Sequence, residues 1–156
     1  MVKMFIGYIS MSGNTEDIAT ILKDVLLENG CEVKMDYLDD IEIETILDYD
    51  CVFIGSYTWG DGDLPYEAED VYEEMNALNL KGVHAACFGS GDTIYPEFCG
   101  AVDIFAETLE KRGGEVFKER LKIELTPDSD EEINECKQFA QSVYEWVLAK
   151  NNVNQV

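Results

Sequence analysis

Short apolar stretches alternate along the chain with longer stretches in which apolar residues recur every three or four positions. The short stretches predict β-strands and the periodic ones predict amphipathic helices. Two of them, 51–55 and 83–88, are apolar at almost every position, which is typical of strands buried on both faces of a parallel sheet. We predict strands over 2–9, 32–38, 51–55, 83–88 and 115–125, helices over 15–29, 66–78, 101–111 and from 129 onward, and a short helix or turn over 41–47.

This alternation predicts a doubly wound, three-layer α/β fold, in which helices cover both faces of a five-stranded parallel sheet. No linker, repeat or low-complexity segment interrupts the pattern, so we expect one domain over residues 1–150 and a frayed tail over 151–156. Ser129 and Glu132 have the spacing of a capping box at the start of the last helix. Ligands of such sheets bind beyond the carboxyl ends of the strands, so the loops after strands 2–9, 51–55 and 83–88 form the candidate site.

The chain is strongly acidic. Its 156 residues include 33 Asp and Glu against 11 Lys and Arg, which gives a formal net charge of −22. Such a charge repels phosphate backbones and anionic lipids, so we expect neither nucleic acid nor a membrane surface as a partner. No apolar run approaches the roughly 20 residues of a membrane span, and the first ten residues indicate a strand rather than a signal peptide. We therefore expect a cytoplasmic protein.

Cysteine and histidine usage narrows the chemistry further. The five cysteines are odd in number and form no C-x-x-C pair, so neither a disulfide framework nor a zinc ribbon is indicated. We expect Cys51 and Cys87, which lie within apolar runs, to be reduced packing residues. His84 is the only histidine, which argues against a histidine-based metal site and against a Ser-His or Cys-His triad.

The acidic residues are concentrated in one part of the sequence. From Met35 to Leu80 there are 14 acidic residues and no Lys or Arg, and from Met35 to Glu110 there are 19 acidic residues against Lys81 alone. A run of like charges is usually a solvated surface. This run contains two of the three candidate loops, so it is also placed to tune a bound group or to attract basic partners.

The first candidate loop, Ser10 to Thr15, joins a buried strand to the start of a helix. Exposed backbone N–H groups and the positive end of the helix dipole favour an anion at such a junction. Ser10, Ser12 and Thr15 supply hydroxyl groups, and Asn14 supplies an amide. Gly13 allows a ligand to approach the backbone closely. The loop contains no Lys or Arg and matches neither G-x-x-x-x-G-K-[ST] nor G-x-G-x-x-G. It predicts neutral recognition of one phosphate, with an ordinary helix cap as the alternative.

The other two loops each carry an aromatic residue in a polar segment that contains glycine. Trp59 lies in SYTWGDGD, which begins at residue 56, and Tyr95 lies in GSGDTIYPEFCG, which begins at residue 89. Exposed aromatic rings on neighbouring loops can stack on the two faces of one flat heterocycle. The alternative for Trp59 is a packing contact with the helix over 66–78, and Phe98 can point into the core.

These loops resemble the FMN-binding loops of the flavodoxin family. The matching segments are Ser-x-Ser-Gly-Asn-Thr, Thr-Trp-Gly-Asp, and Phe-Gly-Ser-Gly-Asp followed by Tyr and Phe-Cys-Gly, and the likeness covers nearly the whole chain in order and spacing. We expect an uninterrupted fifth strand, as in the short-chain members. The resemblance implies the strand order 2-1-3-4-5, for which flavodoxin is itself a standard example, with FMN bound where the strand order reverses.

The resemblance also implies roles for individual residues. Trp59 would cover the inner face of the isoalloxazine and Tyr95 the outer face. The peptide between Gly60 and Asp61 would flip so that its carbonyl accepts from flavin N5–H, and the amide of Asp61 would face the N5/O4 edge. The residues that would bind the FMN phosphate are Ser10, Ser12, Gly13, Asn14, Thr15 and Thr58. The residues whose backbone would meet the pyrimidine edge are Gly91, Asp92, Glu97 and Cys99. Tyr57 stands where some relatives carry a small hydroxyl residue, so a phosphate contact there is open.

A protein with this site is expected to be a monomeric carrier of single electrons from a basic-surfaced flavodoxin or ferredoxin reductase to acceptor redox enzymes. Stacked rings and acidic surroundings disfavour an anionic reduced flavin and therefore predict a low potential. The main alternative is an FMN-dependent NAD(P)H quinone reductase of the same fold, which would need a substrate pocket and basic residues for a dinucleotide. A phospho-acceptor receiver domain would need acidic residues after the first strand, and a cofactor-free interaction protein would leave the two aromatic residues unexplained.

Overall fold

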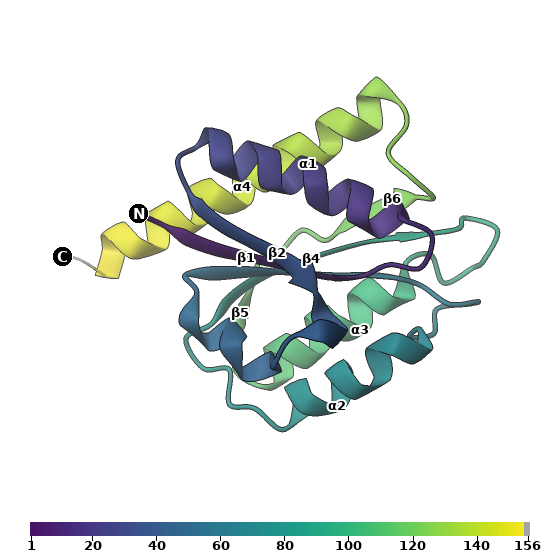
Figure 1. Cartoon of the computed structure of the whole chain (residues 1–156), viewed down its shortest axis with the longest axis horizontal. Helices are drawn as coiled ribbons and strands as arrows, with labels where there is room; N and C mark the ends of the chain where they lie inside the picture. The colour runs from purple at the N-terminus through teal and green to yellow at the C-terminus, as the bar shows by residue number, and fades with distance from the viewer. Residues whose placement is uncertain (155–156) are drawn as a thin grey trace.

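Five strand positions form a parallel sheet that helices cover on both faces (Figure 1). The computed structural model describes residues 1–154. The strands are β1 (Lys3–Ile9), β2 (Glu32–Tyr37), β3 (Cys51–Tyr57), β4 (His84–Gly91), β5 (Glu115–Val116) and β6 (Leu121–Glu124). The order is β2-β1-β3-β4-β5, and β6 also pairs with β4, so β5 and β6 share one position. The predicted α/β fold and strand order are confirmed.

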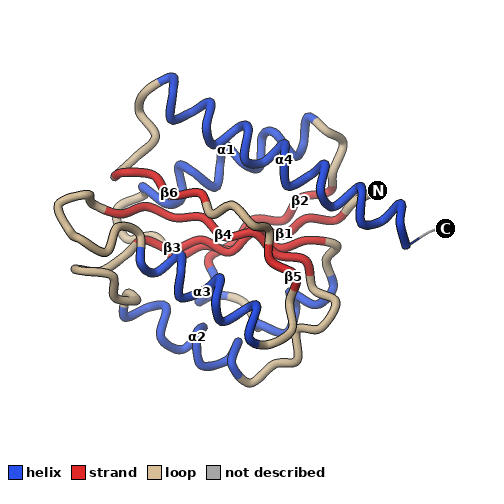
Figure 2. Tube along the Cα trace, turned by 180° about the vertical axis from the view of Figure 1, so that it is seen from behind, coloured by secondary structure: helices blue, strands red, loops and turns tan. Residues whose placement is uncertain are grey.

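Each face of the sheet has its own pair of helices and its own core (Figures 1 and 2). Helices α1 (Asn14–Glu28) and α4 (Asp130–Asn154) cover one face, and α2 (Glu69–Asn76) and α3 (Gly100–Lys111) cover the other. Along β3 the side chains alternate, since Phe53 packs with α1 and α4 while Val52 and Ile54 pack with α2 and α3. This is why 51–55 is apolar without interruption.

The remaining elements adjust the predicted boundaries. Three short 3-10 helices, η1 (Leu38–Asp40), η2 (Ile43–Asp48) and η3 (Tyr66–Ala68), lie in the connections, and η3 takes the start of the predicted helix over 66–78. The amide of Glu132 donates to Ser129 Oγ at 3.1 Å, as the capping box predicts. Helix α4 continues to Asn154, past the expected boundary at 150, and residues 155–156 of the predicted tail lie outside the described residues. Within residues 1–154, no helix has the length and apolar character needed to cross a membrane.

The three central strands pair without any slip in register. Met4 to Ile9 of β1 align with Cys51 to Ser56 of β3, and β3 aligns with β4 as far as Tyr57 and Ser90. The three strands therefore end at nearly the same level. Their following loops project from a single edge of the sheet, on the right in Figure 1. The register of the strands is therefore sufficient to bring the three candidate loops to one edge of the sheet.

The prediction of an uninterrupted fifth strand is wrong. His84 of β4 pairs with Glu115, and Phe88 of β4 pairs with Leu121. The chain thus advances by two more residues between β5 and β6 than along the matching part of β4. Between β5 and β6 the chain contacts both helical layers. Phe117 packs edge-on against Phe139 of α4, at 5.9 Å between ring centroids, while Arg120 Nη1 lies 2.8 Å from the carboxylate of Asp103 in α3. The chain bulges between these two anchors.

The buried cysteines make stability sensitive to alkaline pH. All five are free and buried, and burial raises the pKa of the Cys99 and Cys136 thiols to about 12. The unfolded chain loses these protons above about pH 8.5, while the folded chain keeps them. Each such thiol should lower the free energy of unfolding by about 1.4 kcal/mol per pH unit above that value, and contribute no pH dependence below it.

Urea unfolding between pH 7 and pH 10 measures this effect. In the control variant Cys136→Ala, one titrating thiol is lost, so the stability should fall less steeply with pH although it starts lower. A free energy of unfolding that stays constant from pH 8 to pH 10 would contradict the prediction.

Candidate functional site

The first loop turns so that α1 begins with its amides available. Gly13 precedes the helix with φ 89°, a conformation that favours glycine, and its N–H donates to Ser10 Oγ at 3.1 Å. No described side chain caps α1, so the N–H groups of its first turn lack side-chain acceptors. Ser12 is exposed and Asn14 is half-buried beside them. Amides and hydroxyl groups, without a cation, can bind a phosphate here.

Thr15 differs from the other predicted residues of this loop. Its side chain is fully buried, and its Oγ1 lies 2.9 Å from Oγ of Ser90 at the end of β4. Thr15 therefore ties the start of α1 to the third loop, and either hydroxyl can be the donor of this hydrogen bond. Ser90 was missed by the sequence analysis, although a hydroxyl residue between Gly89 and Gly91 at the end of an apolar strand is an unusual pattern.

A carboxylate in the first turn of α1 has its own partners. Glu16 would compete with an anion for the positive end of the helix. Its two carboxylate oxygens accept from the phenols of Tyr8, at 3.3 Å, and Tyr37, at 3.4 Å. Burial and the charge of Glu16 raise the pKa of Tyr8, so the phenol stays a donor. The contacts hold Glu16 toward β1 and β2.

The second loop is a closed turn that presents Trp59. Two reciprocal backbone hydrogen bonds join Trp59 and Asp63, at 2.9 and 3.0 Å. The turn is possible because Gly60, with φ 52°, and Gly62, with φ 91°, adopt left-handed conformations. Trp59 is 57 % exposed and lines a groove together with Tyr72 and Glu73 of α2, so it is accessible at the surface beside that helix.

Close backbone contact joins the second loop to the third. A Cβ on Gly100 would lie 2.6 Å from Cα of Gly62, so only glycine fits at this crossing. The carboxylate of Asp61 accepts from the N–H of Glu97 at 2.9 Å. Thr58 Oγ1 accepts from the N–H of Ala101 at 3.1 Å, which leaves its own proton free to donate. The two loops thus form one unit.

The third loop holds Tyr95 at the rim of the site. Tyr95 is 42 % exposed, and the backbone N–H of Tyr95 donates to the carbonyl of Asp92 at 3.2 Å. Cys99 ends the loop in a left-handed conformation, with φ 54°. It lies close to Gly91, because a Cβ added to Gly91 would lie 2.9 Å from Sγ of Cys99. Phe98 packs with the α2 and α3 core and therefore points inward.

Tyr57 takes a role that the sequence left open. Its phenol donates to Glu67 Oε2 at 2.7 Å, and burial together with this hydrogen bond raises the pKa of Tyr57. Because a phenol has a single proton, Tyr57 has none left to donate to a phosphate in this arrangement.

Taken together, the loops offer an uncapped helix start beside two exposed aromatic rings. None of the segments 10–15, 57–65 and 91–100 contains Lys or Arg, and all four of their Asp61, Asp63, Asp92 and Glu97 side chains are exposed. Neutral donors suit one phosphate, and the two rings suit a flat heterocycle. This donor set fits FMN, which has both parts.

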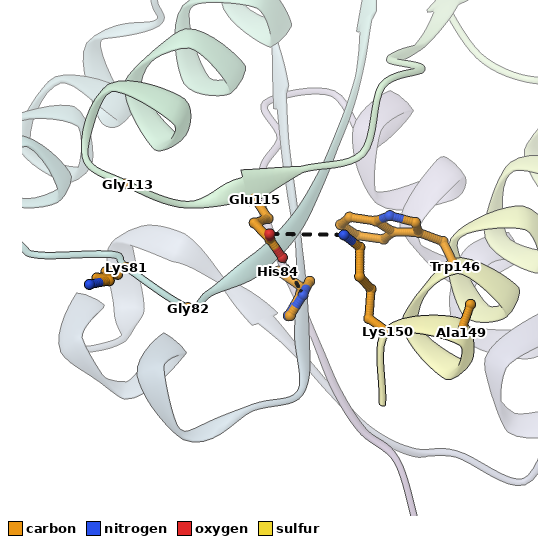
Figure 3. A pocket seen from close by; sticks show the side chains of 8 residues that line it. All are labelled: Lys81, Gly82, His84, Gly113, Glu115, Trp146, Ala149 and Lys150. Carbon is orange, nitrogen blue, oxygen red and sulfur yellow. Dashed lines mark ion pairs between the residues drawn. The ribbon is translucent and has the colours of Figure 1, made fainter. Parts of the chain in front are cut away.

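A separate pocket of about 650 Å³ lies at the opposite end of the sheet (Figure 3). His84 Nε2 lies 2.6 Å from the carboxylate of Glu115, which Lys150 also approaches at 3.9 Å. The His84 ring meets Trp146 edge-on at 5.3 Å. The pocket adjoins the amino end of β4, a strand of 8 residues, so about 25 Å separates it from the three loops.

Comparisons with known proteins agree with this geometry. Residues 6–139 match the family model described as Flavodoxin. The chain is 50 % identical to "Probable flavodoxin 1" of Bacillus subtilis (strain 168) over 94 % of this chain and 92 % of that protein. It is 34 % identical to the flavodoxin of Maridesulfovibrio salexigens, over 84 % and 92 % of the two chains. The crystal structure of oxidised flavodoxin 2 from Bacillus cereus superposes with a TM-score of 0.89 at 47 % identity, covering 92 % of this chain and 98 % of that one.

The crossing of Gly62 and Gly100 can be tested by substitution. Gly100→Ala should push the second loop away from the third and weaken FMN binding by about tenfold or more, since backbone atoms at 2.6 and 2.7 Å must shift. Titration of the apoprotein with FMN, followed by quenching of flavin fluorescence, measures the dissociation constant.

Gly114→Ala is the matched control. Gly114 lies beyond the other end of α3, also at an ordinary φ, and its added Cβ would lie 2.9 Å from the carbonyl oxygen of Leu109. This variant should lose comparable stability and keep its FMN affinity. Equal affinity losses in both variants would show a general effect on the fold instead of one on the loops.

Proposed function

Because this chain belongs to the flavodoxin family, we propose that it holds FMN non-covalently between its three loops and carries single electrons from a reductase to acceptor redox enzymes. It is an electron-transfer protein rather than an enzyme. The observation that supports this function best is the meeting of an uncapped, neutral helix start with the loops that carry Trp59 and Tyr95 at one edge of the sheet. When bound, FMN supplies the redox chemistry, and the chain binds and tunes it.

The first loop is proposed to bind the phosphate of FMN. The exposed hydroxyl of Ser12, the side chain of Asn14 and the free proton of Thr58 are suitable donors, together with the amides of the first turn of α1. Ser10 positions the loop through its hydrogen bond to the amide of Gly13. Thr15 contributes its amide, and also its hydroxyl proton when Ser90 is the donor of the hydrogen bond between them.

The second and third loops are proposed to hold the flavin ring system. Trp59 would cover the inner face and Tyr95 the outer face. Backbone groups of the third loop would meet the pyrimidine edge. The carbonyls of Gly91, Asp92 and Cys99 already accept from the amides of Leu125, Tyr95 and Val102, at 2.8, 3.2 and 3.0 Å, and the amide of Glu97 already donates to Asp61. The amides of Asp92 and Cys99 and the carbonyl of Glu97 are therefore the groups proposed for this edge.

The peptide after Gly60 is proposed to respond to reduction. Apart from Gly60 and its two neighbours in the chain, no described atom lies within 4 Å of the position that a Cβ of Gly60 would take, which leaves space beside this peptide. After rotation its carbonyl can accept from flavin N5–H, which favours the form that carries one electron and one proton. The carboxylates of Asp61, Asp63 and Glu97 would then disfavour the negative charge that a second electron, added without a proton, brings to the ring. This arrangement predicts a low second potential.

The acidic surface is proposed to attract partners with basic surfaces, such as a flavodoxin or ferredoxin reductase. A net charge of −22 also opposes self-association, so we propose a monomer. Five reduced, buried thiols are consistent with a cytoplasmic location.

The quinone reductase alternative is not favoured. It would need cationic residues for a dinucleotide close to the flavin. The pocket that carries Lys81 and Lys150 lies at the other end of the sheet, about 25 Å from the proposed flavin site, so a nicotinamide bound there would be too far for hydride transfer.

Purified protein is expected to be yellow and to release about one FMN per chain on denaturation, because the three loops form one site. Chemical reduction should occur in two separate one-electron steps, and NADPH alone should not reduce the protein rapidly. A colourless protein that does not take up added FMN would refute the proposal, and rapid reduction by NADPH would favour the enzyme.

When the apoprotein is titrated with FMN, Trp59→Ala should bind FMN about 5- to 150-fold more weakly, because one stacked ring is lost. Tyr66→Ala is the control, since Tyr66 is an exposed aromatic residue of η3 that has no proposed flavin contact. Its FMN affinity should be unchanged.

Gly60→Val should narrow the gap between the two one-electron potentials. With a β-branched residue at this position, both the observed φ of 52° and the proposed rotation become unfavourable. The added Cβ itself would not clash with neighbouring atoms. A loss of about 1.4 kcal/mol corresponds to about 59 mV for one electron. Spectroscopic redox titration measures both potentials. Ser12→Ala, which removes a proposed phosphate donor, should weaken FMN binding but keep the gap, and an unchanged gap in Gly60→Val would refute the rotation.

A further inference from the structure

The pocket at the amino end of β4 is built from three separate parts of the chain (Figure 3). These are the segment before β4, the start of β5 and the last turns of α4. We call it the amino-end pocket, and its functional side chains are Lys81, His84, Glu115, Trp146 and Lys150. Its volume of about 650 Å³ is in the range of small-molecule sites.

The charge of the amino-end pocket is opposite to that of the chain. Its lining contains two lysines, Lys81 and Lys150, and one carboxylate, Glu115. The whole chain has 33 Asp and Glu against 11 Lys and Arg. The Glu115 carboxylate already has partners, because one oxygen lies 2.6 Å from His84 Nε2 and the other lies 3.9 Å from Lys150 Nζ. An anion that enters the pocket therefore meets a locally cationic surface.

Trp146 gives the amino-end pocket an aromatic wall. Its side chain is half-buried, and it lines the pocket together with the small side chain of Ala149. The rings of His84 and Phe117 meet the indole at 75° and 61°, so neither of them is stacked parallel to it. A flat ligand ring can therefore stack on the indole.

The aromatic wall and the outer lysine lie on opposite sides of the pocket. Figure 3 shows Trp146 on one side and Lys81 on the other, with Glu115 and His84 between them. The ammonium of Lys150 reaches toward Glu115 in the middle. Lys81 is directed outward and is exposed, so its long side chain can turn toward an anionic group at the mouth of the pocket. A ligand that uses both sides needs a ring at one end and an anion at the other.

We propose that the amino-end pocket is a second binding site of this protein, for a nucleoside monophosphate. The base stacks on Trp146, the ribose spans the middle of the pocket, and the phosphate lies between the ammonium groups of Lys81 and Lys150. About 25 Å separates this site from the three loops, so it is distinct from the proposed flavin site. The inference therefore goes beyond the proposed function and does not depend on it.

The groove beside Trp59 is a poor site for the same ligand. It also has a volume of about 650 Å³ and a tryptophan in its lining. Its charged lining residues are Asp63, Glu69 and Glu73, all of them acidic. These carboxylates repel a phosphate, whereas the two lysines of the amino-end pocket attract it.

The amino-end pocket contains its own spectroscopic reporters. His84 is the only histidine of the chain, and Trp146 is one of two tryptophans, the other being Trp59. Adenosine 5′-monophosphate is titrated into the FMN-loaded protein, in which FMN occupies the other phosphate site. The NMR signals of the His84 imidazole and the Trp146 indole N–H should shift until they saturate, and the Trp59 indole signal should stay in place.

Both ends of the ligand should contribute to binding. Adenosine, which lacks the phosphate, and inorganic phosphate, which lacks the ring, should each bind at least about tenfold more weakly. Lys81→Gln and Lys150→Gln should each weaken binding of the monophosphate about two- to fivefold, as expected for exposed charge pairs. Trp146→Leu should weaken it about 5- to 150-fold through the loss of stacking, with His84 as the reporter.

Two further variants separate a local effect from a change in net charge. Lys137→Gln is the control, because Lys137 is an exposed lysine of α4 outside the pocket lining, and its affinity for the monophosphate should be unchanged. Glu115→Gln should strengthen binding about two- to fivefold, since it removes the carboxylate of the pocket and releases Lys150.

The absence of saturable shifts up to about 5 mM monophosphate would overturn the inference. So would equal affinities for adenosine and its monophosphate, an equal loss of affinity in Lys137→Gln, or a shift of the Trp59 signal without one of Trp146. Failure of the protein to bind FMN would instead defeat the proposed function, while His84 and Trp146 would still report on the amino-end pocket. The two failures are therefore distinguishable.

Discussion

The function of this molecule depends on the parallel pairing of β1, β3 and β4. These strands are buried on both faces and pair without a slip, so they end at the same edge of the sheet. A shift of one residue would exchange the two cores, moving Phe53 to the side of α2 and α3. Register is therefore strongly specified by packing. The same packing decides that an anion-binding helix start and two aromatic loops share one site.

Within that frame, the loops are positioned by small residues and buried hydroxyl groups rather than by charge pairs. Gly62 and Gly100 meet at a distance that excludes any side chain, and Thr15 joins Ser90 beneath the first loop. Such contacts have little freedom to rearrange, because displacement would leave buried polar groups without partners. A flavin site built this way is largely formed before the ligand arrives, which lowers the entropic cost of binding.

The sequence predicted the elements that burial dictates and missed what depends on contacts between distant residues. Strands 51–55 and 83–88 were evident because both of their faces are covered. The break in 115–125 was invisible for a physical reason. The insertion is two residues long, so Phe117, Leu121 and Ile123 still face the same core and the alternation continues across the bulge. The Thr15–Ser90 contact spans 75 residues, and no local pattern encodes it.

The acidic charge distribution is compatible with the way in which the first loop is proposed to recognise a phosphate. A lysine in that loop would bind the anion, but its field would extend about 8–10 Å at physiological salt and would weaken the negative potential at the partner surface. Backbone amides and hydroxyl groups act as dipoles whose influence falls off within a turn of helix. They can hold the phosphate while leaving the edge of the sheet acidic. The proposed neutral recognition at Ser12 and Asn14 would therefore be compatible with an acidic surface around Glu97 and Glu124, because the cofactor would be bound without cancelling the field proposed to attract basic partners.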